Sequence, residues 1–208
     1  MIDASLNEVE AIAAKAARGA DLSWGLSEET GKAARWLAAC GIDWAPSLLA
    51  LLAVGDKLAG PFDSAIGRRV SPLLAGSYFA DLGTSEMRLS NVAHPAWILP
   101  FAARVAALHC TTVRVGWAGA SVIVSSIGCE LAGSINDLMA PHVEIVSWSP
   151  LPLGNDQTRG AGARPNRTRS SINIAAWQAL EVLGARTYVP ASDQSRTMGA
   201  GAGLNDND

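Results

Sequence analysis

The middle of the chain reads Thr112-Val-Arg-Val-Gly-Trp-Ala-Gly-Ala-Ser-Val-Ile-Val124. β-Branched residues alternate with other residues on both sides of Ala118-Gly119-Ala120, which is typical of a β-hairpin closed by a glycine turn. Two further strands are predicted at Met87–Ala93 and at His142–Trp148, the second because it alternates in the same way. We therefore expect a small antiparallel sheet in the second half of the chain.

Helical patterns dominate the first half and recur after the hairpin. Asn7 precedes Glu10 by three residues, which is the spacing of a helix-capping pair, and Gly19 is suited to end that helix. The short connection that follows predicts that the first two helices pack as a hairpin. The predicted helices are 7–18, about 27 to 41, one after Asp43 with Pro46 in its first turn, one from Ser71-Pro72, about Pro100 to His109, and one capped by Asn173.

Strands grouped after helices indicate an α+β fold rather than alternating βαβ units. We expect a helical region at residues 1–84 and an α+β region at residues 85–208. The second region contains a long loop at 149–170 and a glycine-rich C-terminal loop. Whether the two regions form one integrated domain is left open.

Composition indicates a folded chain that buries much of its surface. Apolar residues make up 49% of the 208 residues and charged residues 17%. The seven tryptophans are either half-buried packing anchors or part of an interface with a partner or a second copy. The net charge of -3 lacks the basic footprint of a nucleic-acid-binding protein. The densest basic cluster lies in the predicted loop and comprises Arg159, Arg164, Arg167 and Arg169.

No motif defines a reaction, a cofactor or a metal site. The dinucleotide and phosphate-loop fingerprints and the serine nucleophile elbow are absent from the sequence. Cys40, Cys110 and Cys129 show no metal-ligand spacing, and the histidines are equally scattered. His94 is a candidate for lining a pocket in an extended setting, and His109 is expected as a helix-terminal cation beside a buried Cys110 thiol.

The N-terminus lacks the pattern of a signal peptide, and no apolar run is long enough to span a bilayer. We therefore expect a cytoplasmic protein without a membrane partner. On the second helix, Glu28 and Glu29 are expected in the first turn, and Glu28 is expected to pair with Lys32.

The C-terminal stretch is the best candidate for a binding site. Its alternating glycines can present a concave run of N–H donors beside an arginine, which suits a carboxylate or a phosphate. The predicted ligand-binding residues are Tyr188, Ser192, Ser195, Arg196, Gly199, Gly201 and Gly203. Two alternatives are open: a flexible terminus, or a cation held by Asp206 and Asp208.

Both ends of the chain resemble a bacterial family of uncharacterised proteins, known as a domain of unknown function. The similar segments are Asn7-Glu-Val-Glu10, Lys15-Ala-Ala-Arg-Gly19, Trp24-Gly25-Leu26, Glu29-Thr-Gly31, Arg35-Trp36-Leu37, Tyr188-Val-Pro-Ala-Ser192, Ser195-Arg196, Gly199-Ala-Gly-Ala-Gly-Leu204 and Asp206-Asn-Asp208. Residues 42–85 do not take part in the resemblance. It implies neither a substrate nor a reaction.

Three functional hypotheses follow. The leading one is a small anionic metabolite bound between the two halves, with the C-terminal loop closing the pocket and Arg196 as the charge partner. The second is a non-catalytic accessory or assembly protein, including a homo-oligomer, that uses a Trp-rich interface of low charge. The third and weakest is a DNA-binding regulator that uses the first two helices, although Glu28 and Glu29 would face phosphates with the wrong sign.

Overall fold

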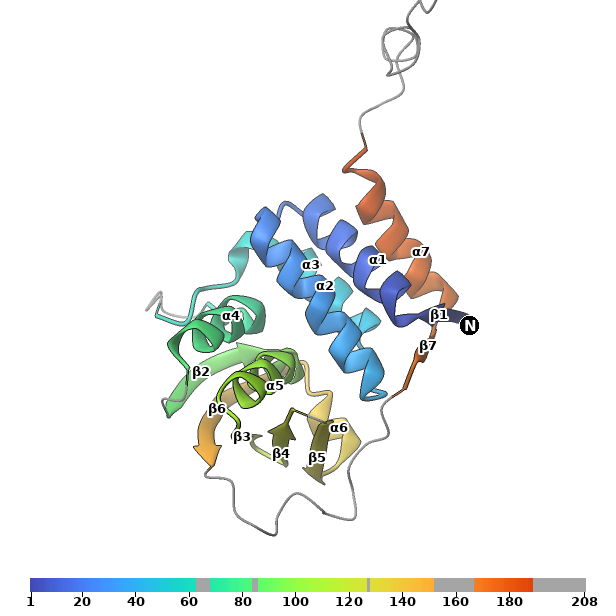
Figure 1. Ribbon diagram of the computed structural model, residues 1–208. Coiled ribbons are helices and arrows are strands. Elements are labelled where there is room, and N and C mark those ends of the chain that lie inside the picture. The colour runs from blue at the N-terminus through green and yellow to red at the C-terminus, as the bar shows by residue number, and fades with distance from the viewer. Residues whose placement is uncertain (63–67, 84–85, 127, 152–166, 189–208) are drawn as a thin grey trace, which may run out of the picture.

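The computed structural model describes residues 1–62, 68–83, 86–126, 128–151 and 167–188. It confirms the α+β class, because helices fill the N-terminal half and a five-stranded antiparallel sheet lies in the C-terminal half. Figure 1 shows two groups of elements. The α-helices α1, α2, α3 and α7 lie together, and α4 and α5 lie against the sheet.

The helices lie close to their predicted places. Ser71 caps α4 through the Leu74 amide, and Asn173 caps α7 through the Ala175 amide, as expected. The helices are α1 (Leu6–Gly19), α2 (Trp24–Ala39), α3 (Ala45–Val54), α4 (Pro72–Leu82), α5 (Leu99–Leu108), α6 (Ile135–Leu138) and α7 (Ile174–Ala185). The short helix α6 was not predicted.

The first helix begins earlier than predicted, because the cap is Ser5 and not Asn7. The Ser5 hydroxyl accepts a hydrogen bond from the Glu8 amide, and the Glu8 carboxylate accepts one from the Ser5 amide at 2.7 Å. The reciprocal pair satisfies two free N–H groups at the helix start. Asn7 instead accepts a hydrogen bond from Arg35 of α2 at 2.6 Å.

The second helix also begins earlier, with Ser23 as its cap rather than near Ser27. Glu28 and Glu29 therefore lie beyond its first turn, and the prediction for them was wrong. Helices α1 and α2 pack side by side as the expected hairpin (Figure 1). Gly31 permits this approach, since a methyl group there would lie 2.7 Å from the Glu10 carbonyl oxygen.

The sheet has the strand order β2-β6-β3-β4-β5, with every neighbouring pair antiparallel. The predicted hairpin is confirmed as β3 and β4, and β5 and the last residues of β6 were missed. The strands of this sheet are β2 (Met87–Ala93), β3 (Thr112–Trp117), β4 (Ala120–Ser125), β5 (Gly128–Gly133) and β6 (His142–Leu151). On the helix-covered face, the rings of Phe79 and Trp148 meet edge to face with centroids 5.5 Å apart.

A second, two-stranded sheet joins the start of the chain to a segment near its end. Strand β1 (Ile2–Ser5) pairs with β7 (Arg169–Ile172), and α7 then packs on α1. Arg169 donates to the Asp3 carboxylate at 2.6 Å. Neither strand was predicted, and both ends of the expected loop at 149–170 belong to strands; its residues 152–166 lie outside the described parts of the chain.

Most tryptophans are packing residues. Trp44, Trp97, Trp117 and Trp148 are buried, and Trp36 and Trp177 are half-buried. The indole N–H of Trp97 donates to the Ser47 hydroxyl at 2.9 Å, and that hydroxyl donates to the Trp44 carbonyl. Only Trp24, which is 67% exposed, presents most of its side chain to solvent.

Within the described parts of the chain, no helix combines the length and apolar character needed to cross a membrane.

Candidate functional site

A groove of about 540 Å³ lies between α2 and α5, where the helical layer meets the sheet layer. The α2 side contributes Glu29, Lys32, Ala33 and Trp36. The α5 side contributes Pro100, Phe101, Ala103, Arg104 and Ala107, and Ser126 follows strand β4. We call this hollow the α2–α5 groove. It combines charged groups with an apolar wall, which is the usual make-up of a small-molecule site.

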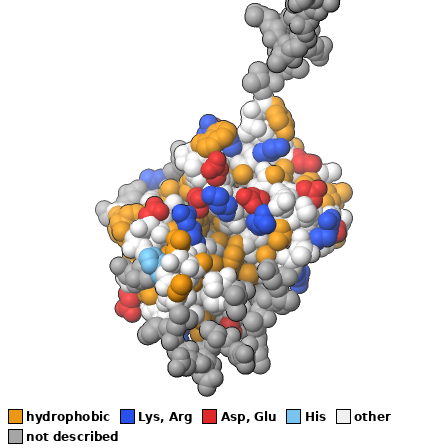
Figure 2. All heavy atoms as spheres, viewed as in Figure 1, with side chains coloured by type: hydrophobic (Ala, Val, Ile, Leu, Met, Phe, Trp, Pro, Cys, Tyr) orange, Lys and Arg blue, Asp and Glu red, His pale blue; other side chains and the backbone are white. Residues whose placement is uncertain are grey.

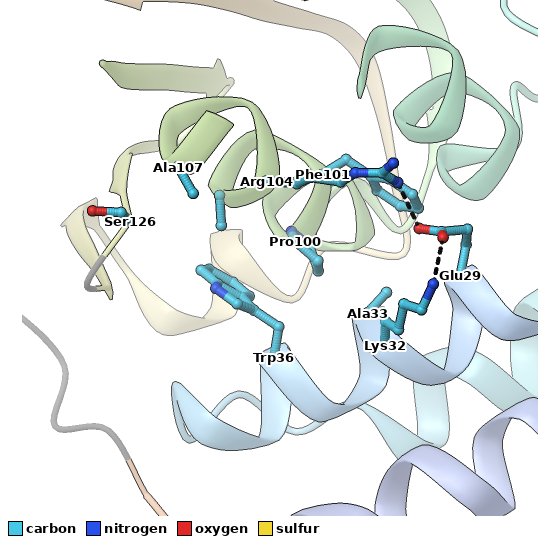
Figure 3. A pocket seen from close by; sticks show the side chains of 10 residues that line it. Glu29, Lys32, Ala33, Trp36, Pro100, Phe101, Arg104, Ala107 and Ser126 are labelled. Atoms are coloured by element: carbon cyan, nitrogen blue, oxygen red, sulfur yellow. Dashed lines mark hydrogen bonds and ion pairs between the residues drawn. The ribbon is translucent and has the colours of Figure 1, made fainter. Parts of the chain in front are cut away.

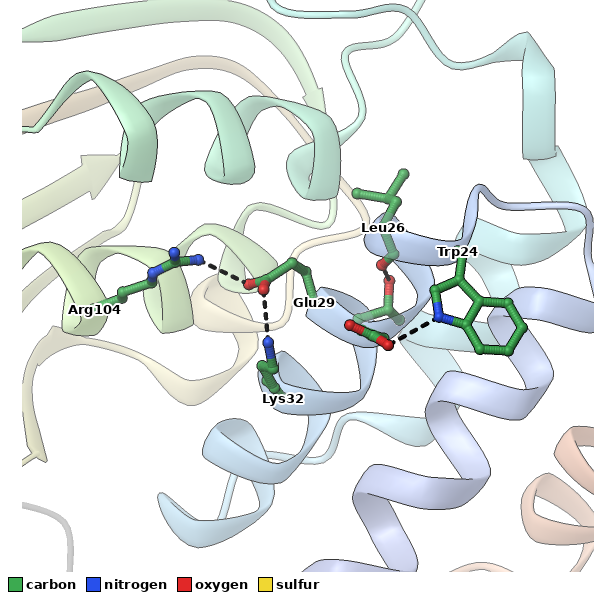
Figure 4. Close-up of polar contacts among 7 residues, drawn as sticks. Trp24, Leu26, Glu29, Lys32 and Arg104 are labelled. Atoms are coloured by element: carbon green, nitrogen blue, oxygen red, sulfur yellow. Dashed lines mark hydrogen bonds and ion pairs between the residues drawn. The ribbon is translucent and has the colours of Figure 1, made fainter.

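One end of the groove is charged. The Arg104 guanidinium donates to one Glu29 oxygen at 3.1 Å, and the Lys32 ammonium donates to the other at 2.9 Å (Figures 3 and 4). Two cations thus share a single carboxylate, which leaves one net positive charge. Both cations also keep unused N–H donors, since an ammonium carries three and a guanidinium five.

The middle of the groove is apolar. The half-buried indole of Trp36 projects from α2 toward Ala107 of α5, as Figure 3 shows. Phe101 also lines the groove and is buried. Trp36 therefore offers an aromatic surface in the same groove as the cations, and the Ser126 hydroxyl lies at the opposite end from the ion pairs.

Helix packing fixes the wall of the groove. Gly76 of α4 faces the Phe101 ring, and any side chain at residue 76 would overlap it. Thr30 is buried and its hydroxyl donates to the Leu26 carbonyl at 2.7 Å, within α2 (Figure 4). Glu29 and Lys32 are thus carried on a helix whose other side is buried.

The predicted pair of Glu28 and Lys32 does not form. Glu28 instead accepts a hydrogen bond from the Trp24 indole at 3.0 Å (Figure 4). Lys32 pairs with Glu29, three residues away rather than four. The difference matters because it places the lysine at the groove.

Of the residues predicted for the C-terminal site, Tyr188 alone belongs to the described parts of the chain. Tyr188 is 63% exposed and its ring lies beside Lys15 of α1, 5.9 Å from the ammonium to the ring centroid. It does not line the α2–α5 groove. The other predicted ligand-binding residues lie outside the described residues: Ser192, Ser195, Arg196, Gly199, Gly201 and Gly203. Their role stays a prediction, as does the alternative for Asp206 and Asp208.

The histidines and cysteines form no second candidate centre. His94 has a left-handed backbone with φ 40°, not the extended one expected, and burial together with nearby Arg69 lowers its pKa. Cys40 and Cys129 are buried, but Cys110 is exposed, so the prediction of a buried thiol beside His109 was wrong. Among the described residues, no three His, Cys, Asp or Glu side chains come together as metal ligands.

The fold and the groove define an α+β protein with a small amphipathic hollow between its helical and sheet layers. Residues 4–85 match the model of a family described as a protein of unknown function (DUF3726). This match confirms the resemblance to a family of unknown function for the opening part of the chain, and it also covers residues 42–85, where no resemblance was expected. It does not reach the closing part. No curated protein and no solved structure matches the chain.

Sequence reasoning missed the groove itself. Arg104 and Glu29 are 75 positions apart, and each has an ordinary residue type for an exposed helix face. The one available signal was Lys32 and Trp36 on the same face as Glu29, at spacings of three and seven residues.

Proposed function

We propose that the α2–α5 groove binds a small anionic molecule that also carries an apolar or aromatic part. The observation behind this proposal is the sharing of Glu29 by Arg104 and Lys32. A carboxylate or phosphate group can take up the donors that Glu29 leaves unused, and it can also replace Glu29 on either cation. The side chains of Lys32 and Arg104 are 58% and 46% exposed, so a ligand can reach them without a rearrangement of the core.

The aromatic part of the ligand is suggested by Trp36. A planar or apolar group that extends from the cations along the groove would pack on the indole and lose its contact with water. An anion without such a group would meet only the charged end, where exposed ion pairs contribute little free energy. The groove therefore favours an amphipathic anion over inorganic phosphate.

We also propose that the C-terminal stretch covers the α2–α5 groove. In this proposal Arg196 supplies a further cation, and the amides of Gly199, Gly201 and Gly203 donate to the anion. What supports it is composition alone, so it is tested separately from the groove by deleting residues 191–208.

A Trp-rich interface has less support, because four of the seven tryptophans are buried in the core.

The helical-hairpin regulator also has less support. Glu10, Glu28 and Glu29 lie among the cations on the outer face of α1 and α2, and Figure 2 shows acidic and basic side chains intermixed in the middle of this face. This mixture of acidic and basic side chains is not the continuous basic surface that is typical of a nucleic-acid-binding protein.

The test is calorimetric titration with phenyl phosphate. Two further probes are titrated in the same way: inorganic phosphate, which lacks the aromatic ring, and benzyl alcohol, which lacks the anionic group. Arg104→Gln should weaken the binding of phenyl phosphate roughly tenfold, since a charge-assisted contact is lost. Arg35→Gln is the matched control, because Arg35 also lies 3.1 Å from a glutamate, Glu10, and is 45% exposed. Equal affinities of the wild type, Arg104→Gln and Lys32→Gln would refute the groove as the binding site.

A further inference from the structure

A second hollowed surface lies beside α4, on the far side of the Arg104–Glu29 ion pair. Its first part, which we call the leucine hollow, has a volume of about 550 Å³. The second part, the tyrosine hollow, has a volume of about 530 Å³ and includes Tyr78. The side chains of Leu26 and Leu74 line both hollows, so the two adjoin. The leucine hollow is lined mainly by Leu22, Leu26, Leu51, Leu58, Leu73 and Leu74.

Large apolar side chains around these hollows are open to solvent. Leu74, Tyr78 and Leu82 follow one another at intervals of four residues on α4 and are 39%, 38% and 47% exposed. Phe62 is 67% exposed and packs edge to face on Tyr78, with ring centroids 4.7 Å apart. Figure 2 shows hydrophobic side chains at the surface over α4, at the left of the view. A continuous apolar surface of this kind marks an interaction site more often than single exposed residues do.

The rim of the two hollows is acidic. Asp21 borders the leucine hollow, and Glu28 and Asp81 border the tyrosine hollow. None of these three carboxylates forms an ion pair with another described residue. The cations at the hollows are Lys57 and Arg104, and Arg104 is already engaged by Glu29.

We propose that the leucine and tyrosine hollows bind an amphipathic helix of a partner protein whose apolar face is flanked by Lys or Arg. Two adjoining hollows match apolar side chains one or two helical turns apart on such a helix. The unpaired carboxylates on the rim match its flanking cations.

The same charges argue against two other occupants. A second copy of this chain, docked symmetrically, would bring the acidic rim against itself. A fatty acid in the tyrosine hollow would have to place its own carboxylate near Glu28 or Asp81, where Arg104 is already engaged by Glu29. A basic amphipathic helix meets neither conflict.

The experiment uses the full chain and a fluorescent peptide of about 18 Leu and Lys residues with leucines at i, i+3, i+4 and i+7, long enough to form a helix. A second peptide carries Glu in place of Lys. Fluorescence anisotropy should show roughly tenfold tighter binding of the Lys peptide, because the rim is acidic. Leu74→Gln and, independently, Tyr78→Gln should each weaken that binding roughly tenfold. Val182→Gln is the matched control, since Val182 is an apolar helical residue, 64% exposed, on α7.

Each contrary result overturns the proposal in a distinct way. No binding, equal affinity for the two peptides, or insensitivity to both α4 substitutions would remove the docking surface. A wild-type dimer that dissociates in Leu74→Gln would assign the surface to a second copy. Saturable binding of decanoate without binding of the peptide would assign it to an acyl chain. Phenyl phosphate binding should persist in Leu74→Gln, so the fate of the α2–α5 groove is decided separately.

Discussion

The Arg104 guanidinium on α5 lies 3.1 Å from the Glu29 carboxylate on α2, and this ion pair joins the sheet layer to the helical layer. It also separates two surfaces of different character. On one side lies the α2–α5 groove with its Trp36 wall, and on the other side lie the hollows beside α4. Substitutions can therefore alter one surface and leave in place the residues that line only the other.

Glu29→Gln should increase the affinity for phenyl phosphate. The substitution frees Arg104 and Lys32 from the carboxylate that competes with a ligand for their N–H donors, and about 1 kcal/mol of relieved competition corresponds to roughly fivefold tighter binding. Calorimetric titration measures the change. Glu10→Gln, which frees only Arg35 outside the groove, is the control and should have no effect. Weaker binding after Glu29→Gln would mean that the carboxylate orients the cations rather than competing for them.

Ser47→Ala should lower the free energy of unfolding by about 1–3 kcal/mol. The hydroxyl of Ser47 is the acceptor for the fully buried Trp97 indole, and its loss leaves that N–H without a partner. Urea denaturation followed by circular dichroism gives the value. Ser27→Ala is a matched control, since Ser27 is also buried but its hydroxyl only donates to nearby carbonyls, those of Leu22 and Ser23. Equal losses for both variants would contradict this account.

Ser5→Ala should cost about 1 kcal/mol of stability, because it removes the side-chain acceptor of the capping box at the start of α1. Asn7→Ala should cost less, since Asn7 makes an exposed hydrogen bond to Arg35 and does not cap the helix. Thermal unfolding of the two variants side by side distinguishes them. A larger loss of stability for Asn7→Ala than for Ser5→Ala would indicate that Asn7 caps the helix, as the sequence predicted.

His94→Asn should flatten the dependence of stability on pH below neutrality. Burial and Arg69 lower the pKa of His94 from its ordinary value of 6.5, so the unfolded chain binds a proton that the folded protein binds less readily. The contribution of His94 is therefore full above pH 6.5, and it is lost progressively as the pH falls from that value through the lower pKa of the folded protein. Asn tolerates the left-handed backbone, φ 40°, at this position. Denaturation midpoints at several pH values from 7 down to about 5 test this, and an unchanged slope in the variant would refute it.

Elements with local signals could be predicted from the sequence. Pro46, the Ser71-Pro72 pair and Asn173 each mark a helix start by their own chemistry, and alternation marks β3, β4 and β6. Strands β1 and β7 are four residues long and exist because they pair with each other, so a local pattern is too weak to reveal them. Strand β5 begins and ends with glycine and lacks β-branched residues, which hides it in the same way.

The groove could not be predicted because it is a product of packing. Glu29, Lys32 and Trp36 share a helix face, but Arg104 joins them only after α5 docks on α2. The sequence analysis predicted a site at the C-terminal glycines instead, because a glycine-rich composition can be recognised without any knowledge of the fold.

The ribbon of β1 and β7 has a consequence for the order of events during synthesis. Asp3 emerges from the ribosome long before Arg169, its partner 166 positions later, has been made. Until then α1 also lacks α7, which packs on it. Bringing such distant segments together carries a loop-closure entropy that is recovered only at the end. The part of the molecule that is translated first is thus completed last, and a nascent chain with its sheet formed but its opening helices still uncovered is the expected precursor.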